Sequence, residues 1–185
     1  MIPMLSYIQE LDAVLALIEQ IGRGLDREGL AFDPRMPVGA MIEVPAVALS
    51  APIFARRLDF LSIGTNDLIQ CTLAIDRMDD TASYLHDPLH PAILRLIRMT
   101  IEAGWACGIP VSMCGEMAGT PRHVPLLLGL GLREFSMQPG SLLEIKERVC
   151  GSHIPRLERA TEALFAHLDG REPEQFTQAV ERICS

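Results

Sequence analysis

Short apolar runs alternate with longer amphipathic segments along most of the chain. About five runs of mainly apolar residues lie near residues 2–5, 38–43, 58–63, 110–114 and 133–137. Runs this short, bounded by glycine, proline or polar residues, are typical of buried strands. Between them, apolar residues recur every three or four positions, which predicts helices. The alternation predicts an α/β protein with a parallel sheet.

Capping residues, prolines and glycines mark the expected helix boundaries. Ser6–Gln9 has the pattern of a capping box, and Gly29 marks the end of that first helix. A helix is also expected over 46–57, with its regular part beginning near Ser50, because Pro52 is tolerated only in a first turn. Further helices are expected from Leu68, over 91–108, from Thr120, after a second capping box at 141–144, and as two amphipathic helices within 154–185.

The composition is that of a folded, acidic protein. Of the 185 residues, 49% are hydrophobic and 22% are charged, and this excludes a disordered chain. Sixteen Lys and Arg against 24 Asp and Glu give a net charge of −8. General electrostatic binding to nucleic acid is therefore disfavoured, and an anionic substrate needs a local cation.

Cysteine usage and the N-terminus bear on the compartment. The five cysteines are odd in number and form no CxxC pair, which favours a reducing compartment. No apolar stretch approaches the roughly 18–20 residues that span a bilayer, and Met1–Met4 has no basic segment of a secretion signal. We therefore expect a cytoplasmic protein without membrane insertion.

Polar groups follow three of the expected strands at the point where each strand ends. Glu43 follows the first, Asn66 and Asp67 follow the second, and Cys114 ends the third. The carboxyl ends of parallel strands share one edge, where ligands bind, so these groups should converge. Two carboxylates repel each other at short range unless a divalent cation lies between them. Mg²⁺ suits hard oxygen ligands and leaves positions open for a phosphate.

Four motifs then give the chain a family resemblance. They are Met41–Pro45 (MIEVP), Ser62–Leu68 (SIGTNDL), Ala74–Arg77 (AIDR) and Met113–Gly119 (MCGEMAG). In this order they resemble the C-terminal barrel of enzyme I, the phosphoenolpyruvate (PEP)–protein phosphotransferase of the bacterial sugar phosphotransferase system. The GTNDL motif alone is shared with pyruvate phosphate dikinase and PEP synthase, whereas Asp76–Arg77 and CGEMAG favour enzyme I.

The resemblance implies an activity and a role for each site residue. Enzyme I moves the phosphoryl group of PEP to a histidine and releases pyruvate. Glu43 and Asp67 match the Mg²⁺ ligands of the family, and Asp67 also belongs to its substrate site. Asn66 and Arg77 match residues that bind the phosphoryl group. Cys114 matches the residue that protonates the enolate carbon, a role for a thiol that is still protonated.

The resemblance also implies the C-terminal portion of a (β/α)₈ barrel. A closed barrel usually needs roughly 200–250 residues or more, so we expect only part of one. Residues 1–153 would form the partial barrel that binds PEP and Mg²⁺, and residues 154–185 would pack on it as helices. Open sheet edges would favour a homodimer or association with a complementary barrel half. The domain that docks the family's histidine-containing phosphocarrier protein has no counterpart here.

Plainer interpretations of the same residues remain open. A lone Glu or Asp at a strand end is more often a helix cap or a surface charge. Arg77 has acidic neighbours with which to pair, and a cysteine in an apolar strand is usually a core residue. The five histidines show no metal spacing and are expected to be surface or capping groups.

Two rival functions also remain. A fragment of PEP synthase or pyruvate phosphate dikinase would use a nucleotide-charged histidine partner in place of the phosphocarrier protein. A non-catalytic module would only pair with enzyme I-type subunits. Even as a phosphotransferase, the isolated chain is expected to be a poor catalyst, because most of the family's arginines that clamp the phosphoryl group are absent.

Overall fold

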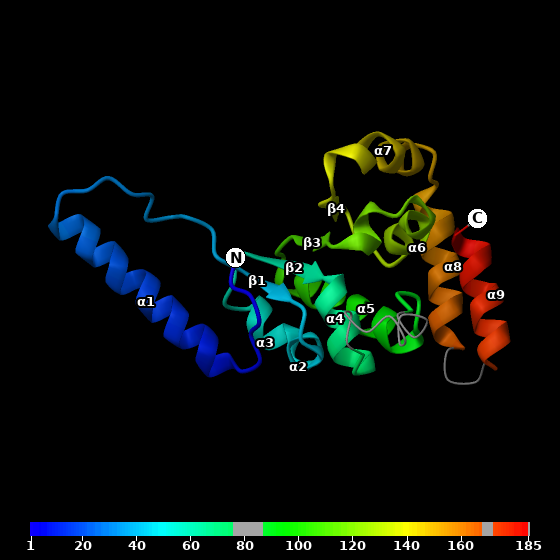
Figure 1. The fold of residues 1–185 in the computed structure, drawn as a ribbon, viewed down its shortest axis with the longest axis horizontal. Coiled ribbons are helices and arrows are strands. Elements are labelled where there is room, and N and C mark those ends of the chain that lie inside the picture. Colours follow the sequence, from blue (N-terminus) through cyan, green and yellow to red (C-terminus); the bar gives the residue numbers. More distant parts are fainter. Residues whose placement is uncertain (76–86, 168–171, 185) are drawn as a thin grey trace.

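A computed structural model describes residues 1–75, 87–167 and 172–184 (Figure 1). Its centre is a sheet of four parallel strands in the order β1-β2-β3-β4. They are β1 Gly39–Ile42, β2 Phe60–Gly64, β3 Val111–Cys114 and β4 Glu134–Phe135. Ile2 adds an isolated parallel bridge to Ala40. Because each strand lies beside the next one in the sequence, the sheet has the arrangement of a barrel wall, and the expected α/β class is confirmed.

Helices connect and flank these strands. They are α1 Ile8–Arg27, α2 Pro45–Leu49, α3 Ala51–Ala55, α4 Thr65–Leu73, α5 Pro91–Cys107, α6 Val124–Gly129, α7 Leu142–Cys150, α8 Ile154–Ala166 and α9 Pro173–Cys184. Short 3₁₀ turns η2, η3 and η4 lie at Glu116–Gly119, Pro121–His123 and Pro139–Ser141. The two expected C-terminal helices are α8 and α9. No helix in the described ranges is both long and apolar enough to cross a membrane.

Two expected helices are interrupted where proline lacks an N–H group. The segment 46–57 divides at Ser50 into α2 and α3, and Pro52 lies in the first turn of α3, where its missing donor costs nothing. The helix expected from Thr120 begins instead as a 3₁₀ turn, and the regular helix starts at Val124 with Pro125 in its first turn.

Both predicted capping boxes need correction. At α1 the capping carboxylate is Glu10 rather than Gln9, and its Oε2 accepts hydrogen bonds from the N–H groups of Ser6 and Tyr7 at 2.6 and 2.9 Å. These hydrogen bonds lower the pKa of Glu10. At α7 the Ser141 side chain makes no capping bond, because Ser141 ends η4 in a helical conformation (φ −88°, ψ −13°) rather than the extended one a cap needs.

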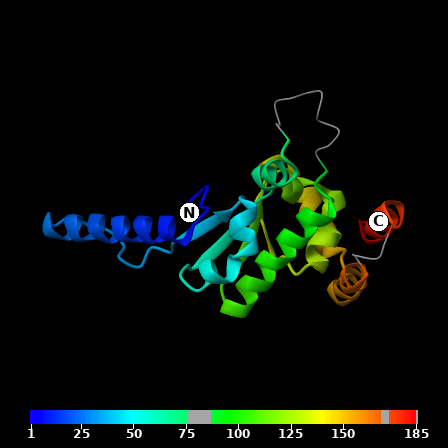
Figure 2. The same cartoon turned by 90° about the horizontal axis from the view of Figure 1, so that it is seen from below.

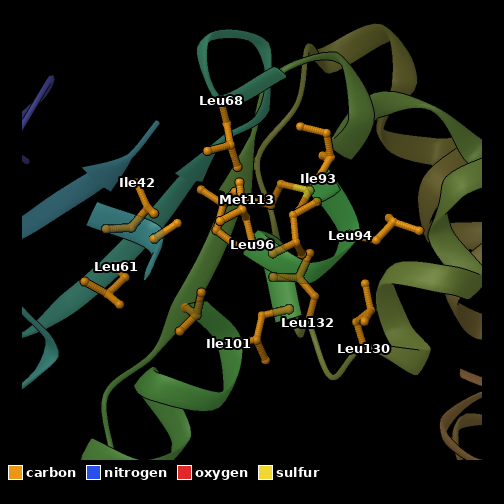
Figure 3. Close-up of a cluster of buried hydrophobic side chains, with 14 of the residues drawn as sticks. Ile42, Leu61, Leu68, Ile93, Leu94, Leu96, Ile101, Met113, Leu130 and Leu132 are labelled. Carbon is orange, nitrogen blue, oxygen red and sulfur yellow. The ribbon is translucent and has the colours of Figure 1, made fainter. Parts of the chain in front are cut away.

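One face of the sheet packs on the main hydrophobic core. Successive strand residues point to opposite faces. On this face lie Ala40, Ile42, Leu61, Ile63, Val111 and Met113, all of them buried. Figure 3 shows Ile42 and Met113 within the cluster that also contains Ile93 and Ile101 of α5. Helix α5 therefore packs against the core face of the sheet.

The two ends of the chain differ in how many of their apolar side chains are buried. Helix α1 projects from the sheet on one side (Figures 1 and 2), and Leu11 is its only fully buried residue. Leu17 and Ile21 on this helix remain exposed, as do apolar residues in the following loop. At the other end α8 and α9 lie side by side, and Leu164 and Val180 join the main core.

Candidate active site

The face of the sheet opposite the core carries polar and sulfur-containing side chains. Met41, Ser62 and Ser112 are register partners across β1, β2 and β3. One step toward the C-terminal edge, Gly64 pairs with Cys114. Parallel strands buried on both faces usually read as continuous apolar runs. The alternation here therefore separates a packing face from a chemically functional one.

Glu43 follows β1 directly and has a buried carboxylate, only 5% exposed. Its Oε1 accepts a hydrogen bond from the Met4 N–H at 2.7 Å. Its Oε2 lies close to Gly64, where an added Cβ would be 3.1 Å from it. Within the described residues no donor bonds to Oε2. Burial excludes a surface charge, and a buried carboxylate with a free oxygen suits a cation.

Helix α4 begins immediately after β2 and is tied to the end of β3. The Thr65 hydroxyl donates to the Cys114 carbonyl at 3.2 Å, and Asn66 Oδ1 accepts from the Glu116 N–H at 3.2 Å. The second bond orients the Asn66 amide and leaves its NH₂ group for another acceptor. Asp67 lies in the first turn of α4 and is exposed. The positive end of the helix dipole favours anionic groups at this position.

The Cys114 residue is partly exposed, and its thiol lies near two side chains of the functional face and one backbone carbonyl of β2. The Ser62 hydroxyl donates toward its Sγ at 3.8 Å. The thiol can itself donate to the Ile63 carbonyl at 3.6 Å or to Met41 Sδ at 3.7 Å. These contacts hold Sγ on the functional face, between β1, β2 and β3.

A pocket of about 700 Å³ opens beside Cys114. Its walls include Asn66, Cys114, Glu116, Ser136, Gln138 and Ser141. This volume lies within the usual range for small-molecule sites, roughly 300–1,000 Å³. Gly115 has φ +98°, and a Cβ there would lie 2.5 Å from Thr65 Oγ1, so the loop needs glycine at this point.

The structure brings together some of the residues expected from the sequence. Asn66 and Cys114 line one pocket, and Glu43 lies beside Gly64, the register partner of Cys114. Asp67 is adjacent to Asn66 in α4 but does not line this pocket. Arg77 lies outside the described residues.

The sequence analysis did not predict the residues after β4 that line the pocket beside Cys114. Ser136 comes directly after β4, and its N–H donates to the Met113 carbonyl at 2.8 Å, which places it next to Cys114. Gln138 and Ser141 complete this wall. Ser136 could have been predicted, because it is a polar residue at the end of the expected strand 133–137, as Glu43 is at the end of the first.

Of the described histidines, His90, His153 and His167 follow the expectation and His123 does not, whereas His86 lies outside the described residues. His90 and His153 accept hydrogen bonds from the N–H groups of Ala92 and Arg156 and thereby cap α5 and α8. His123 is buried instead, and its Nδ1 has no hydrogen-bond partner in the described chain. This burial, with a smaller effect from Arg122, lowers the pKa of His123 below its usual 6.5.

The carboxylates at the strand ends have the ligand chemistry that Mg²⁺ takes in proteins. Mg²⁺ usually takes one or two protein carboxylates, and waters and substrate phosphates complete its octahedron. Buried Glu43 and exposed Asp67 are carboxylates that follow the ends of adjacent strands. No cluster of three or more His, Cys, Asp or Glu side chains suited to a metal occurs in the ranges that the structure describes.

Comparison with known proteins gives consistent relatives. The chain is 50% identical over 183 residues to the phosphoenolpyruvate-protein phosphotransferase of Cupriavidus necator, covering 99% of this chain and 31% of that protein. The protein of the same name from Staphylococcus carnosus is 49% identical over 149 residues, covering 80% and 26%. That from Priestia megaterium is 46% identical with the same coverage. The chain thus spans less than a third of the length of these relatives.

A solved structure and a family model complete the comparison. A crystal structure of a citrate lyase from Burkholderia xenovorans has a TM-score of 0.59 with this chain at 19% identity, covering 97% of this chain and 61% of the other. This likeness shows the fold alone. Residues 1–154 match the family model described as PEP-utilising enzyme, PEP-binding domain. The chain therefore belongs to the PEP-utilising enzymes, within their PEP-binding domain.

Proposed function

We propose that this chain is the PEP- and pyruvate-binding part of a PEP–protein phosphotransferase of the enzyme I type. The reaction moves the phosphoryl group of PEP to a histidine and releases pyruvate. The observation that carries the proposal is the pocket at the C-terminal edge of the sheet, where Asn66 and Cys114 share a wall. The relatives described above are phosphotransferases, which favours this function over a synthase or dikinase.

The substrate would be held by oxygen and amide groups of the strand ends. Glu43 and Asp67 would hold Mg²⁺, which supplies positive charge beside the substrate oxygens when bound. The free NH₂ group of Asn66 donates to a phosphoryl oxygen. Arg77 is the proposed cation for the phosphoryl or carboxylate group, on sequence grounds alone.

Cys114 would act as the acid on the carbon that becomes the methyl group of pyruvate. Its S–H bond breaks, the proton forms the new C–H bond, and the electron pair stays on sulfur. The Ser62 hydroxyl, 3.8 Å from Sγ, donates toward the thiolate left behind. A proton from solvent then restores the thiol.

The same proposal includes the roles of the two parts of the chain, a downstream partner and a compartment. Residues 1–153 would carry the substrate site, and residues 154–185 would support it as packed helices. The phosphocarrier protein would be the downstream partner in sugar transport, and the cytoplasm the compartment. The isolated chain would turn over slowly, since it spans 26–31% of the relatives described above.

Exchange of the pyruvate methyl protons in D₂O tests the proposal without a phosphoryl acceptor. With Mg²⁺, the chain should exchange these protons for deuterium, detected by NMR, because the deprotonated Cys114 can remove them and return deuterium. Cys114→Ala should slow the exchange by about 10²–10⁴-fold. Cys71→Ser, at an exposed cysteine, is the matched control and should exchange like the wild type. Equal rates in Cys114→Ala and wild type would contradict the assignment.

A second candidate is an interaction module, favoured by the exposed apolar side of α1. Leu17 and Ile21 are each 53% exposed, and apolar residues of the following loop line a pocket together with Ile21. We propose that this surface pairs with a second copy or with a complementary barrel half. Light scattering should show association that Leu17→Glu abolishes and Gln20→Glu does not. A monomeric wild type at all concentrations, with no binding to a complementary half, would contradict it.

A further inference from the structure

A second, basic pocket lies between α7, α8 and α9, at the end of the molecule opposite α1 (Figure 1). Its volume is about 240 Å³. Three arginines line it, Arg148 from α7, Arg156 from α8 and Arg182 from α9, together with Ser152 and His153. No carboxylate is among its described lining residues. In a chain of net charge −8, this is an unusual concentration of positive charge.

The nearby acidic groups already have partners or lie outside the pocket. Glu181 pairs with Arg122 at 3.2 Å, and Glu158 pairs with Arg133 at 2.7 Å. Across residues 1–75, 87–167 and 172–184, Arg156 forms no ion pair, and neither does Arg182. Arg156 and Arg182 thus line one pocket without a counterion from the described residues.

The remaining groups fix the walls of this pocket. Arg148 donates to the Cys184 carbonyl at 2.7 Å, which ties the end of α7 to the end of α9. His153 caps α8 by accepting from the Arg156 N–H at 3.3 Å. The first turn of this 13-residue helix therefore borders the pocket, and its dipole adds to the positive potential there.

We propose that this pocket binds a small phosphoryl oxyanion, either inorganic phosphate or the phosphate group of a small metabolite. Guanidinium groups hold phosphate oxygens through paired, charge-assisted hydrogen bonds. Arg156 and Arg182 provide two such groups from different helices. The bound anion joins α8 to α9 and relieves the repulsion between the two guanidiniums.

Size and neighbouring charge restrict the ligand. A volume of about 240 Å³ is below the roughly 300–1,000 Å³ typical of sites for larger molecules. The adjoining pocket is lined by Glu144 and Glu147 beside Arg122 and Arg148, so its charge is mixed and does not extend the basic surface toward a longer polyanion. The site therefore suits a single phosphoryl group rather than a nucleotide.

This site is separate from the PEP site and goes beyond the proposed function. The two pockets are lined by different residues. Helices α8 and α9, which supply Arg156 and Arg182, begin at or beyond the end of the matched PEP-binding domain at residue 154. An anion here would act on the C-terminal helices, and not on the phosphoryl-transfer residues.

Calorimetric and thermal-shift titration of the 185-residue chain with inorganic phosphate tests the site, at constant ionic strength against chloride. The wild type should bind phosphate and its Tm should rise, whereas the variant Arg156→Ala/Arg182→Ala should bind at least tenfold more weakly. Arg159→Ala, an exposed arginine of α8 outside the pocket, is the matched control and should bind like the wild type. Asn66→Ala should keep this binding, which separates it from the PEP site.

The second arm identifies the source of the phosphoryl group. A titration with glycerol phosphate should compete with inorganic phosphate in the wild type if the site accepts a metabolite, and should not compete if it takes only the free ion. Arg156→Lys/Arg182→Lys retains the charges and should bind more weakly than the wild type, because the paired donors are lost. Phosphate binding no stronger than that of chloride, or equal loss in Arg159→Ala, would overturn the proposal.

Discussion

The two faces of the parallel sheet are built from alternate residues of the same strands, yet one packs against helices and the other borders a pocket. On the core face, Ile42, Ile63 and Met113 are completely buried against the helical layer. On the opposite face, Ser62 and Cys114 form polar contacts next to a pocket. A strand that only supported the fold would be apolar on both sides. The difference teaches that stability and chemistry can be changed separately at positions one residue apart.

The largest expected effect comes from a cavity on the core face. Ile63→Ala should lower the free energy of unfolding by about 2–5 kcal/mol, because the fully buried side chain leaves a cavity among packed neighbours. Urea denaturation followed by circular dichroism measures the loss. Ser62→Ala, the adjacent residue on the other face, should cost less than about 1.5 kcal/mol. Equal losses in the two variants would break the distinction between the faces.

A smaller loss is expected at the loop of the functional face. Gly115→Ala should destabilise the protein by about 1–3 kcal/mol, because φ is +98° and the new Cβ would meet Thr65 Oγ1 at 2.5 Å. The displaced Thr65 and Asn66 should also weaken PEP binding. Gly140→Ala, where an added Cβ meets no atom within 4 Å, is the control for both denaturation and calorimetry. Unchanged PEP binding in Gly115→Ala would contradict the proposed site.

Ser62→Ala should affect the thiol more than the fold. Without the hydroxyl that donates toward Sγ, the sulfur loses a hydrogen bond as it reacts, so its alkylation by iodoacetamide at fixed pH should be slower. Ser112→Ala, at the register partner on β3, is the control. Its hydroxyl donates to the Leu61 carbonyl at 3.5 Å instead. An identical slowing in both variants would show a general change of the sheet rather than a specific contact.

The smallest expected effect is a pH dependence at His123, a buried polar residue outside both faces. Its pKa is lowered by burial, so below pH 6.5 the unfolded chain binds a proton more readily than the folded protein. The histidine's contribution to stability is therefore lost as the pH falls from 6.5 toward the lowered pKa. Thermal denaturation between pH 7.5 and 5.5 should show this slope. A slope that persists in His123→Gln would assign it to other groups.

The sequence predicted the fold where local rules decide the outcome. Apolar runs identified β1 to β4, whereas the run expected at 2–5 forms only an isolated bridge at Ile2. Pro91 and Gly108 delimit α5 as expected, because proline suits a first turn and glycine a left-handed cap. The strand-end rule also selected Glu43, Asn66 and Cys114. Their proposed roles come from the family resemblance and, like those of Asp67 and Arg77, stay predictions.

The parts that could not be predicted depend on contacts between distant residues. Nothing near Glu43 indicates that the N–H of Met4, which has φ +53°, bonds to its carboxylate. Ser62 belongs to an apolar run and shows its contact with Cys114 only after the strands pair. The burial of His123 depends on how the loop after β3 folds back. A single sequence does not encode these contacts as a local pattern.

Calorimetric titration of PEP into the purified chain, with and without Mg²⁺ and in phosphate-free buffer, tests the central claim most directly. The functional face should bind PEP only when Mg²⁺ is present, and Asp67→Ala should abolish the binding while the protein stays folded. Arg156→Ala/Arg182→Ala should leave it unchanged. A folded wild type that binds no PEP in the presence of Mg²⁺, or an Asp67→Ala variant that binds it equally well, would contradict the account.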